Sequence, residues 1–196
     1  MNADNQLDTL QSNDKKEILK LIKEVLIWGD SKESIELLPT VTDSKDSVYI
    51  GFDLLKLKSN LDKLKRTNYF ATEFIDNYRQ IIETIDKKLR KGEYEKWLVG
   101  DLPTFIFAND YSPWWAGQES FPTEQGAIEL INLDKNKGEF NFTCGEKGRA
   151  CEGMENYKMR FRVTKEDNKW KISYLDGFNF KESTRQDGVP EKTTTR

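Results

Sequence analysis

Helical spacing of apolar residues dominates the first half of the chain. Over residues 14–28, apolar side chains recur every three or four positions and lysines take the opposite side, which predicts a helix capped by Asp14 and stopped by Gly29. The same spacing predicts a second helix over 52–64 and a longer third helix over 68–90. Residues 31–48 are polar and are expected to form a loop.

The hydrophobic period changes to two after Trp97. This alternation predicts half-buried strands in five segments: 104–108, 127–133, 139–144, 157–164 and 169–174. Polar connections at 134–138 and 166–169 are typical of antiparallel hairpins. Helices followed by strands, without alternation between them, predict one α+β domain over 14–180. In it, about three N-terminal helices pack on a curved antiparallel sheet of four to six strands.

The two ends of the chain are polar and carry no period. Residues 1–13 and 181–196 are therefore expected to be disordered. The opening residues lack the features of a signal peptide, and no segment approaches the ~20 apolar residues that cross a bilayer. A cytosolic protein and a mature exported protein whose signal has been replaced by Met1 both remain open. The polar opening favours a periplasmic or outer-membrane-anchored location over a cytoplasmic one.

Composition excludes more functions than it suggests. The 196 residues include 11 Phe, 7 Tyr and 5 Trp but no histidine, which removes the usual general base, the Ser-His and Cys-His pairs and the commonest metal ligand. No glycine-rich phosphate loop follows a strand. The 31 basic and 34 acidic residues are interspersed, so nucleic acid is not an expected partner. We expect no metal and no cofactor, and the chemistry left open is a desolvated carboxylate assisted by a tyrosine.

Cys144 and Cys151 are the only two cysteines. They enclose a short glycine-containing loop between strand-like segments, where a disulfide would clip a hairpin. Two independent reduced thiols are an equal alternative, because one pair of cysteines does not identify a compartment. Two thiols without any imidazole do not make a zinc site, which needs four ligands.

The densest group of unusual residues is the segment 97–115, which holds three tryptophans, two prolines and two aspartates. Such a segment lines a pocket or a partner surface, because Trp and Tyr bring large contact areas. Alternatively, its rings cap the open end of the sheet and its aspartates bond to backbone amides. No residue is assigned a catalytic role, and the candidate ligand- or partner-binding residues are Tyr78, Trp97, Asp101, Asp110, Tyr111, Trp114 and Trp115.

Three sequence segments carry a resemblance to a known superfamily. The last strand region reads Asn168-Lys-Trp-Lys-Ile-Ser-Tyr-Leu-Asp-Gly-Phe178, the third helix carries Phe70-Ala-Thr-Glu-Phe-Ile-Asp-Asn-Tyr78, and Gly100-Asp-Leu-Pro103 follows. With the helices-then-sheet order, they resemble the nuclear-transport-factor-2-like superfamily, and more narrowly its uncharacterised bacterial members, many of them exported or lipid-anchored in Gram-negative bacteria. The resemblance covers about residues 14–180.

This resemblance implies a cone-shaped, cystatin-like fold with a cavity between sheet and helices. In ketosteroid-isomerase-like members, an aspartate and a tyrosine do the chemistry in that cavity. No residue of this sequence matches those catalytic positions one by one, and fold alone does not transfer an activity.

These observations favour a non-catalytic binding domain, exported in a Gram-negative bacterium. It would hold a small apolar ligand in the cone or a protein partner on the segment 97–115, and it would be a monomer or a homodimer. One alternative is an immunity or inhibitor protein that neutralises a toxin. The other is an isomerase- or hydratase-like enzyme with Asp101 or Asp110 as base and Tyr78 or Tyr111 as donor.

Overall fold

Helices and an antiparallel sheet make up an α+β structure, given by a computed structural model that describes residues 3–116, 126–146, 149–150 and 157–188. Side chains are described for the same ranges except 3–12, 144–146 and 149–150. The elements in chain order are α1 (Ala3–Gly29), β1 (Thr40–Thr42), β2 (Tyr49–Phe52), α2 (Leu54–Thr67), α3 (Thr72–Lys91), β3 (Gly126–Leu133), β4 (Lys137–Glu146), β5 (Arg149–Ala150), β6 (Lys158–Glu166), β7 (Lys169–Leu175), the 3-10 turn η2 (Asp176–Phe178) and α4 (Phe180–Ser183).

The main sheet has the strand order β3-β4-β6-β7, with every pair antiparallel, and the short β5 pairs with the end of β4. These strands confirm the alternating segments after residue 126. The strand expected within 104–108 does not form. Instead, Phe105 makes a single bridge to Gln186, and Ala108 adopts a φ of 56°, which ends the extended backbone.

A small hairpin pairs β1, which lies inside the stretch 31–48 expected to be a loop, with β2, which directly follows that stretch. Its turn is held by the Asp43 carboxylate, whose Oδ1 accepts a hydrogen bond of 2.8 Å from the backbone N–H of Ser47. The polar composition of the stretch hides this hairpin, because β1 and β2 are short and only Phe52 and Gly51 are buried in them.

Helix ends differ from the sequence expectations where tertiary contacts compete. Helix α1 runs from Ala3, so Asp14 is not its N-cap; the Asp14 carboxylate instead accepts bonds from Trp170 Nε1 at 2.9 Å and Lys165 Nζ at 3.1 Å. Helix α3 begins at Thr72, because the residues before it pair with β7: the Ala71 N–H donates to the Ile172 carbonyl at 2.9 Å.

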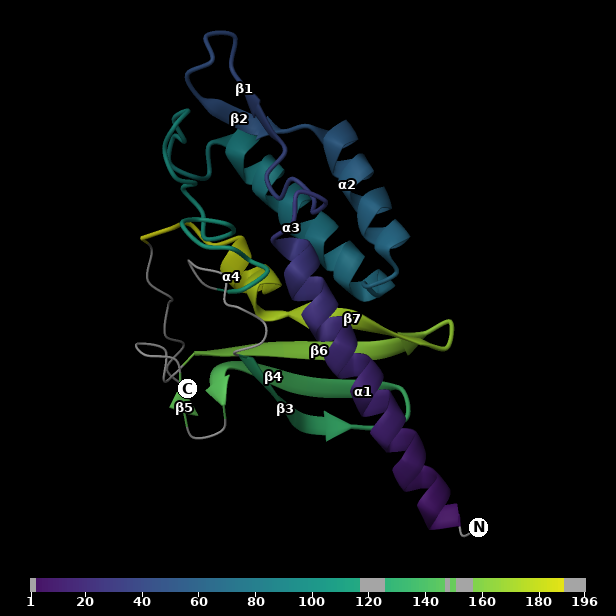
Figure 1. Ribbon diagram of the computed structural model, residues 1–196. Coiled ribbons are helices and arrows are strands. Elements are labelled where there is room, and N and C mark those ends of the chain that lie inside the picture. The colour runs from purple at the N-terminus through teal and green to yellow at the C-terminus, as the bar shows by residue number, and fades with distance from the viewer. Residues whose placement is uncertain (1–2, 117–125, 147–148, 151–156, 189–196) are drawn as a thin grey trace, which may run out of the picture.

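The core lies between the helices and the inner face of the sheet. Figure 1 shows α1 crossing one face of the sheet, while α2, α3 and the β1–β2 hairpin lie beyond the β7 edge. Aromatic rings fill the space between these layers: Phe70 stacks on Phe74 at 4.6 Å between ring centroids, and Trp114 lies 4.7 Å from Phe178. None of the described helices is long and apolar enough to span a membrane.

The chain beyond Phe180 stays in the fold, although the sequence predicted disorder from residue 181. Ser183 and Thr184 are buried, and the Thr184 carbonyl accepts hydrogen bonds of 2.7 Å from the Tyr94 hydroxyl and from Lys88 Nζ. These contacts come from distant segments, so a local pattern does not reveal them. Residues 189–196 lie outside the described part of the chain.

Candidate functional site

The three tryptophans of the segment 97–115 are all buried. Trp114 packs against Trp28, Phe70, Phe74 and Phe178, with ring-centroid distances from 4.7 to 6.3 Å, and Trp115 packs against Phe142 at 5.9 Å. Of the two roles that the sequence left open for these rings, burial assigns Trp114 and Trp115 to packing. Neither indole is on the surface for a partner to touch.

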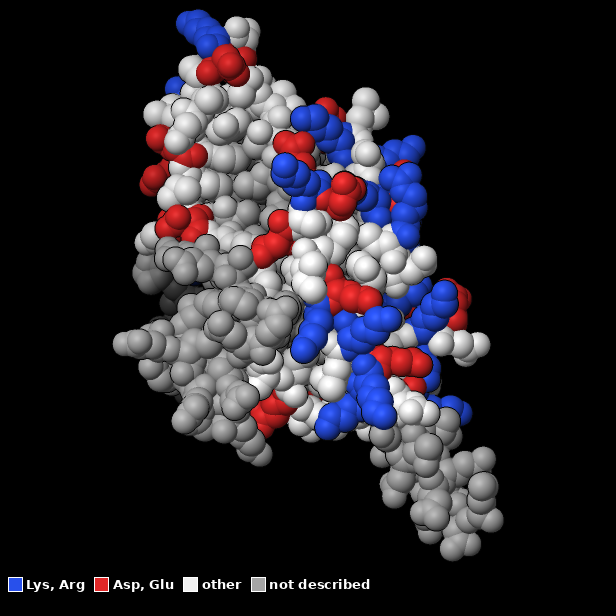
Figure 2. Space-filling view, in the orientation of Figure 1, with Lys and Arg blue, Asp and Glu red and all other residues white. Residues whose placement is uncertain are grey.

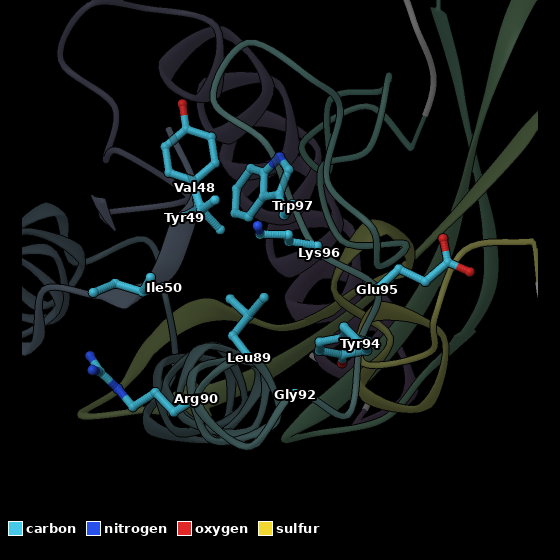
Figure 3. Close-up of a pocket in the computed structure, with 10 residues that line it drawn as sticks. All are labelled: Val48, Tyr49, Ile50, Leu89, Arg90, Gly92, Tyr94, Glu95, Lys96 and Trp97. Carbon is cyan, nitrogen blue, oxygen red and sulfur yellow. The ribbon is translucent and has the colours of Figure 1, made fainter. Parts of the chain in front are cut away.

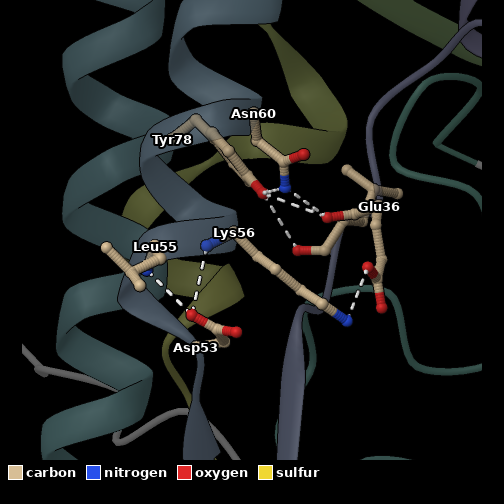
Figure 4. Close-up of polar contacts among 7 residues, drawn as sticks. Glu36, Asp53, Leu55, Lys56, Asn60 and Tyr78 are labelled. Atoms are coloured by element: carbon tan, nitrogen blue, oxygen red, sulfur yellow. Dashed lines mark hydrogen bonds and ion pairs between the residues drawn. The ribbon is translucent and has the colours of Figure 1, made fainter.

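Tyr78 is also a packing residue. Its hydroxyl accepts a hydrogen bond from Asn60 Nδ2 at 3.3 Å and donates one to the Leu37 carbonyl at 3.1 Å, so it fastens the segment before β1 to α2 and α3 (Figure 4). Burial raises the pKa of Tyr78 well above its ordinary value. The nearby Glu36 carboxylate is turned to Lys56, 3.5 Å away, and not to the phenol.

The remaining candidates of the enzyme hypothesis do not form a buried acid–tyrosine pair. Asp101 and Asp110 are both exposed, and Asp110 has a φ of 53° in a turn. Tyr111 is half-buried, and this burial raises its pKa to about 12. Neither aspartate is therefore the desolvated carboxylate that such an enzyme requires. Among the side chains described, no group of three or more metal-binding residues occurs.

The predicted disulfide falls outside the described residues. The side chain of Cys144 is not described, and Cys151 belongs to the undescribed residues 151–156. The pairing of these two cysteines stays a prediction.

Trp97 lines a cleft at the C-terminal end of α3. This cleft, called here the α3 cleft, has a volume of about 490 Å³ and lies between the C-terminal end of α3, strand β2 and residues 94–97 (Figure 3). Its apolar wall consists of Tyr49, Ile50, Leu89, Tyr94 and Trp97, and Arg90, Glu95 and Lys96 add charge. The rings of Tyr49 and Trp97 lie 4.2 Å apart.

Backbone pairing fixes this ring pair. The Tyr49 N–H donates to the Trp97 carbonyl at 2.9 Å, and Val48, directly before β2, forms an isolated antiparallel bridge with Leu98. The Trp97 indole N–H donates to the Asp101 carbonyl at 3.0 Å, which closes the following turn. The indole therefore meets the Tyr49 ring in one fixed orientation, because both backbones are held.

An ion pair clamps β2 to α3 below the cleft. Both oxygens of Asp86 accept from Arg90 Nε at 2.9 Å, and Asp86 Oδ1 also accepts the Phe52 N–H at 2.7 Å. Arg90 Nη2 donates to the Phe52 carbonyl at 3.2 Å, and the hydrogen bonds that Arg90 donates to Asp86 raise the pKa of Arg90. A Cβ on Gly51 would lie 2.6 Å from Asp86 Oδ1, so only glycine fits beside this clamp.

Exposed apolar side chains continue the wall of the cleft outward. Ile50 lines the cleft itself, and Leu98, Val99 and Leu102 follow Trp97 in the chain; all four are 40 to 57% exposed. Lys96 forms no ion pair among the described residues, and Figure 3 shows its ammonium group directed into the cleft. The site thus combines paired rings, aliphatic surface and one uncommitted cation.

Charge is unevenly distributed on the face seen in Figure 2. Lys and Arg gather over α1 and α2, and Asp and Glu lie among them as well as on the opposite side of the view. The acidic groups interrupt the basic ones, as the interspersed sequence predicts, and no unbroken basic surface appears on this face.

No protein-family model matches this sequence, and no curated protein is significantly similar to it.

Proposed function

We propose that this protein is a non-catalytic binding domain and that the α3 cleft is its site. The observation that carries the proposal is the fixed ring pair of Tyr49 and Trp97 beside the exposed Ile50, Leu98 and Leu102. A concave aromatic wall that continues into exposed aliphatic surface is typical of ligand and partner sites. Folding alone gives no reason to leave these aliphatic side chains in water.

The charges at the cleft select among ligands. Lys96 is uncommitted, and the Arg90 guanidinium at the floor is only partly occupied by Asp86, since its side chain is 48% exposed. An amphipathic ligand with an aromatic or aliphatic body and one acidic group fits both features. The body would lie on Tyr49, which the buried Trp97 holds in place, and on Ile50, and the acid would lie toward Lys96.

The cone-shaped arrangement of the nuclear-transport-factor-2-like superfamily is also part of this proposal. The order of helices followed by an antiparallel meander supports it. The superfamily's usual cavity is a poor place for the ligand here, because Phe70, Phe74, Trp114 and Phe178 occupy the space between helices and sheet. A surface cleft is therefore the better site. Export in a Gram-negative bacterium stays a prediction.

A protein partner is the second candidate, and the exposed Leu98, Val99 and Leu102 favour it because they extend past the cleft. A toxin that this chain neutralises would be one such partner. Leu102→Asp separates the two functions: it leaves a small ligand in the cleft bound and abolishes binding of a protein that covers the rim.

The test uses 8-anilinonaphthalene-1-sulfonate, which joins an aromatic body to an acidic group. We expect saturable binding with enhanced probe fluorescence, and about a five- to thirtyfold loss of affinity in Lys96→Glu, because an attraction and a new repulsion are each worth about 0.5 to 1 kcal/mol. Lys87→Glu on the exposed side of α3 is the matched control, since it changes net charge equally away from the cleft. Equal affinities of the two variants would overturn the proposed site.

A further inference from the structure

A second, polar groove lies on the outer side of the sheet, away from the α3 cleft. It consists of two adjoining clefts of about 600 and 250 Å³, one reaching α4 and the other reaching the β3–β4 hairpin. Both clefts are lined by Glu73 of α3, Arg162 of β6 and Ser173 of β7. These three residues therefore stand at the junction, where a bound molecule would meet all of them.

Arg162 is held in place but has no acidic partner. Its guanidinium lies over the Tyr174 ring, 4.2 Å from the centroid, and it forms no ion pair among the described residues. Arg160, two residues earlier on the same strand face, pairs with both Glu139 at 3.7 Å and Asp176 at 3.6 Å. Stacking orients the guanidinium of Arg162 and leaves its N–H edge available for a carboxylate.

A β-bulge brings Ser173 to the same place. Val163 pairs with Ile172 and Arg162 pairs with Tyr174, so Ser173 is the additional residue of β7. Its hydroxyl makes no hydrogen bond to another described group, although the residue is largely buried and lines both clefts. Bulges commonly redirect a side chain beside a functional site.

Glu73 supplies the opposite charge. It lies in the first turn of α3, where the helix dipole stabilises its carboxylate, and it forms no ion pair among the residues described. Asp76, one turn later, is paired with Arg79 at 3.3 Å. At the junction that both clefts share, the groove thus places the cation of Arg162 and the anion of Glu73, neither of which forms an ion pair among the described residues.

We propose that this groove binds a small zwitterion that carries a carboxylate and an ammonium group. The carboxylate accepts bonds from Arg162 and the Ser173 hydroxyl, and the ammonium group donates to Glu73. A simple anion would be repelled by Glu73, and a simple cation would be repelled by Arg162. The volume of the larger cleft suits a small molecule. This site is independent of the function proposed for the α3 cleft.

The test is a titration followed by ¹H–¹⁵N NMR with glycine, 4-aminobutanoate and 6-aminohexanoate, which vary the separation of the two charges. Butanoate and butylamine carry one charge each. We expect one amino acid to bind at least tenfold more tightly than either single-charge compound and to shift the amide signals of Glu73, Arg162 and Ser173. Arg162→Gln should weaken its binding at least fivefold, and Glu73→Gln likewise.

Lys87→Gln is the matched control, because Lys87 is an exposed residue of α3 that does not line the groove and forms no ion pair among the described residues. It should leave the affinity unchanged, and the dispersed amide spectrum of each variant shows that it is folded. Butanoate binding as tightly as the best amino acid would overturn the zwitterion site. So would an Arg162→Gln variant with the affinity of the unmodified protein, or amide shifts confined to residues outside the groove.

Discussion

Replacing Asp86 by alanine should destabilise the protein more than replacing any exposed acid on the same helix. Asp86 is buried, its side chain is 12% exposed, and it joins α3 to β2 through the Phe52 N–H and Arg90. The alanine variant leaves the Phe52 N–H without its partner and removes the anion that orients Arg90. The wall of the α3 cleft then loses its attachment to the helix.

Two losses set the magnitude. An orphaned buried N–H costs about 1 to 3 kcal/mol. Breaking a buried ion pair costs ~3 to 5 kcal/mol, but Arg90 is about half exposed and regains water, so its share is nearer 1 kcal/mol. We expect Asp86→Ala to lower the free energy of unfolding by about 2 to 4 kcal/mol. Asp86→Asn keeps an acceptor for Phe52 and should lower it by about 1 to 2 kcal/mol.

Urea unfolding followed by far-ultraviolet circular dichroism measures these values. Asp76→Ala is the control, because the exposed Asp76–Arg79 pair lies on the same helix and contributes less than about 0.5 kcal/mol. A free energy of unfolding for Asp86→Ala within 0.5 kcal/mol of that of Asp76→Ala would refute the clamp. An Asp86→Asn variant less stable than Asp86→Ala would refute the role given to the Phe52 bond.

Three further changes probe other contacts. Asp14→Ala removes the acceptor of the Trp170 indole N–H and should lower the free energy of unfolding by about 1 to 2 kcal/mol in urea; an unchanged value would show that this bond does not anchor α1. Gly177→Ala places a Cβ 2.0 Å from the Pro113 carbonyl oxygen and should cost at least ~2 kcal/mol in the same assay, unless the backbone moves freely. Burial raises the pKa of Tyr111 to about 12, so folding favours its neutral form. The contribution of this group to stability is complete below pH 10 and is lost as the pH rises through 12. Tyr111→Phe should reduce that alkaline loss of thermal stability, and an unchanged loss would assign it to other groups.

The sequence predicted the regular parts of the fold because their periods are local. The apolar stripe of α3 and the alternation of apolar and polar residues in β6 and β7 can be read from short runs of neighbouring residues, and the structure confirms them. The β1–β2 hairpin was not predicted, because its strands are only three and four residues long and are too short to show a period. Helix α4 was not predicted either, because tertiary contacts hold this segment in place. One of them is the hydrogen bond from the Tyr94 hydroxyl to the Thr184 carbonyl, directly after the helix.

The candidate site was less predictable than the fold. Trp97 was selected for its residue type, and the structure places it in the α3 cleft, but its partner Tyr49 lies 48 residues earlier in a stretch without a strong period. The tryptophans at 114 and 115 share the same composition signal and are core residues. Aromatic density marks where burial is large, and it does not separate a packed ring from a ring that lines a surface cleft.

The distribution of carboxylates limits where acid–base chemistry could take place among the described residues. The sequence has no histidine, so acid–base catalysis would depend on a desolvated acid. Among the described residues Asp86 is the one buried acid, and both of its oxygens are already bonded to Arg90 and Phe52. Using Asp86 as a base would mean breaking the clamp that holds the cleft wall. The stability lost in Asp86→Ala therefore also measures the cost of freeing this carboxylate from its present partners.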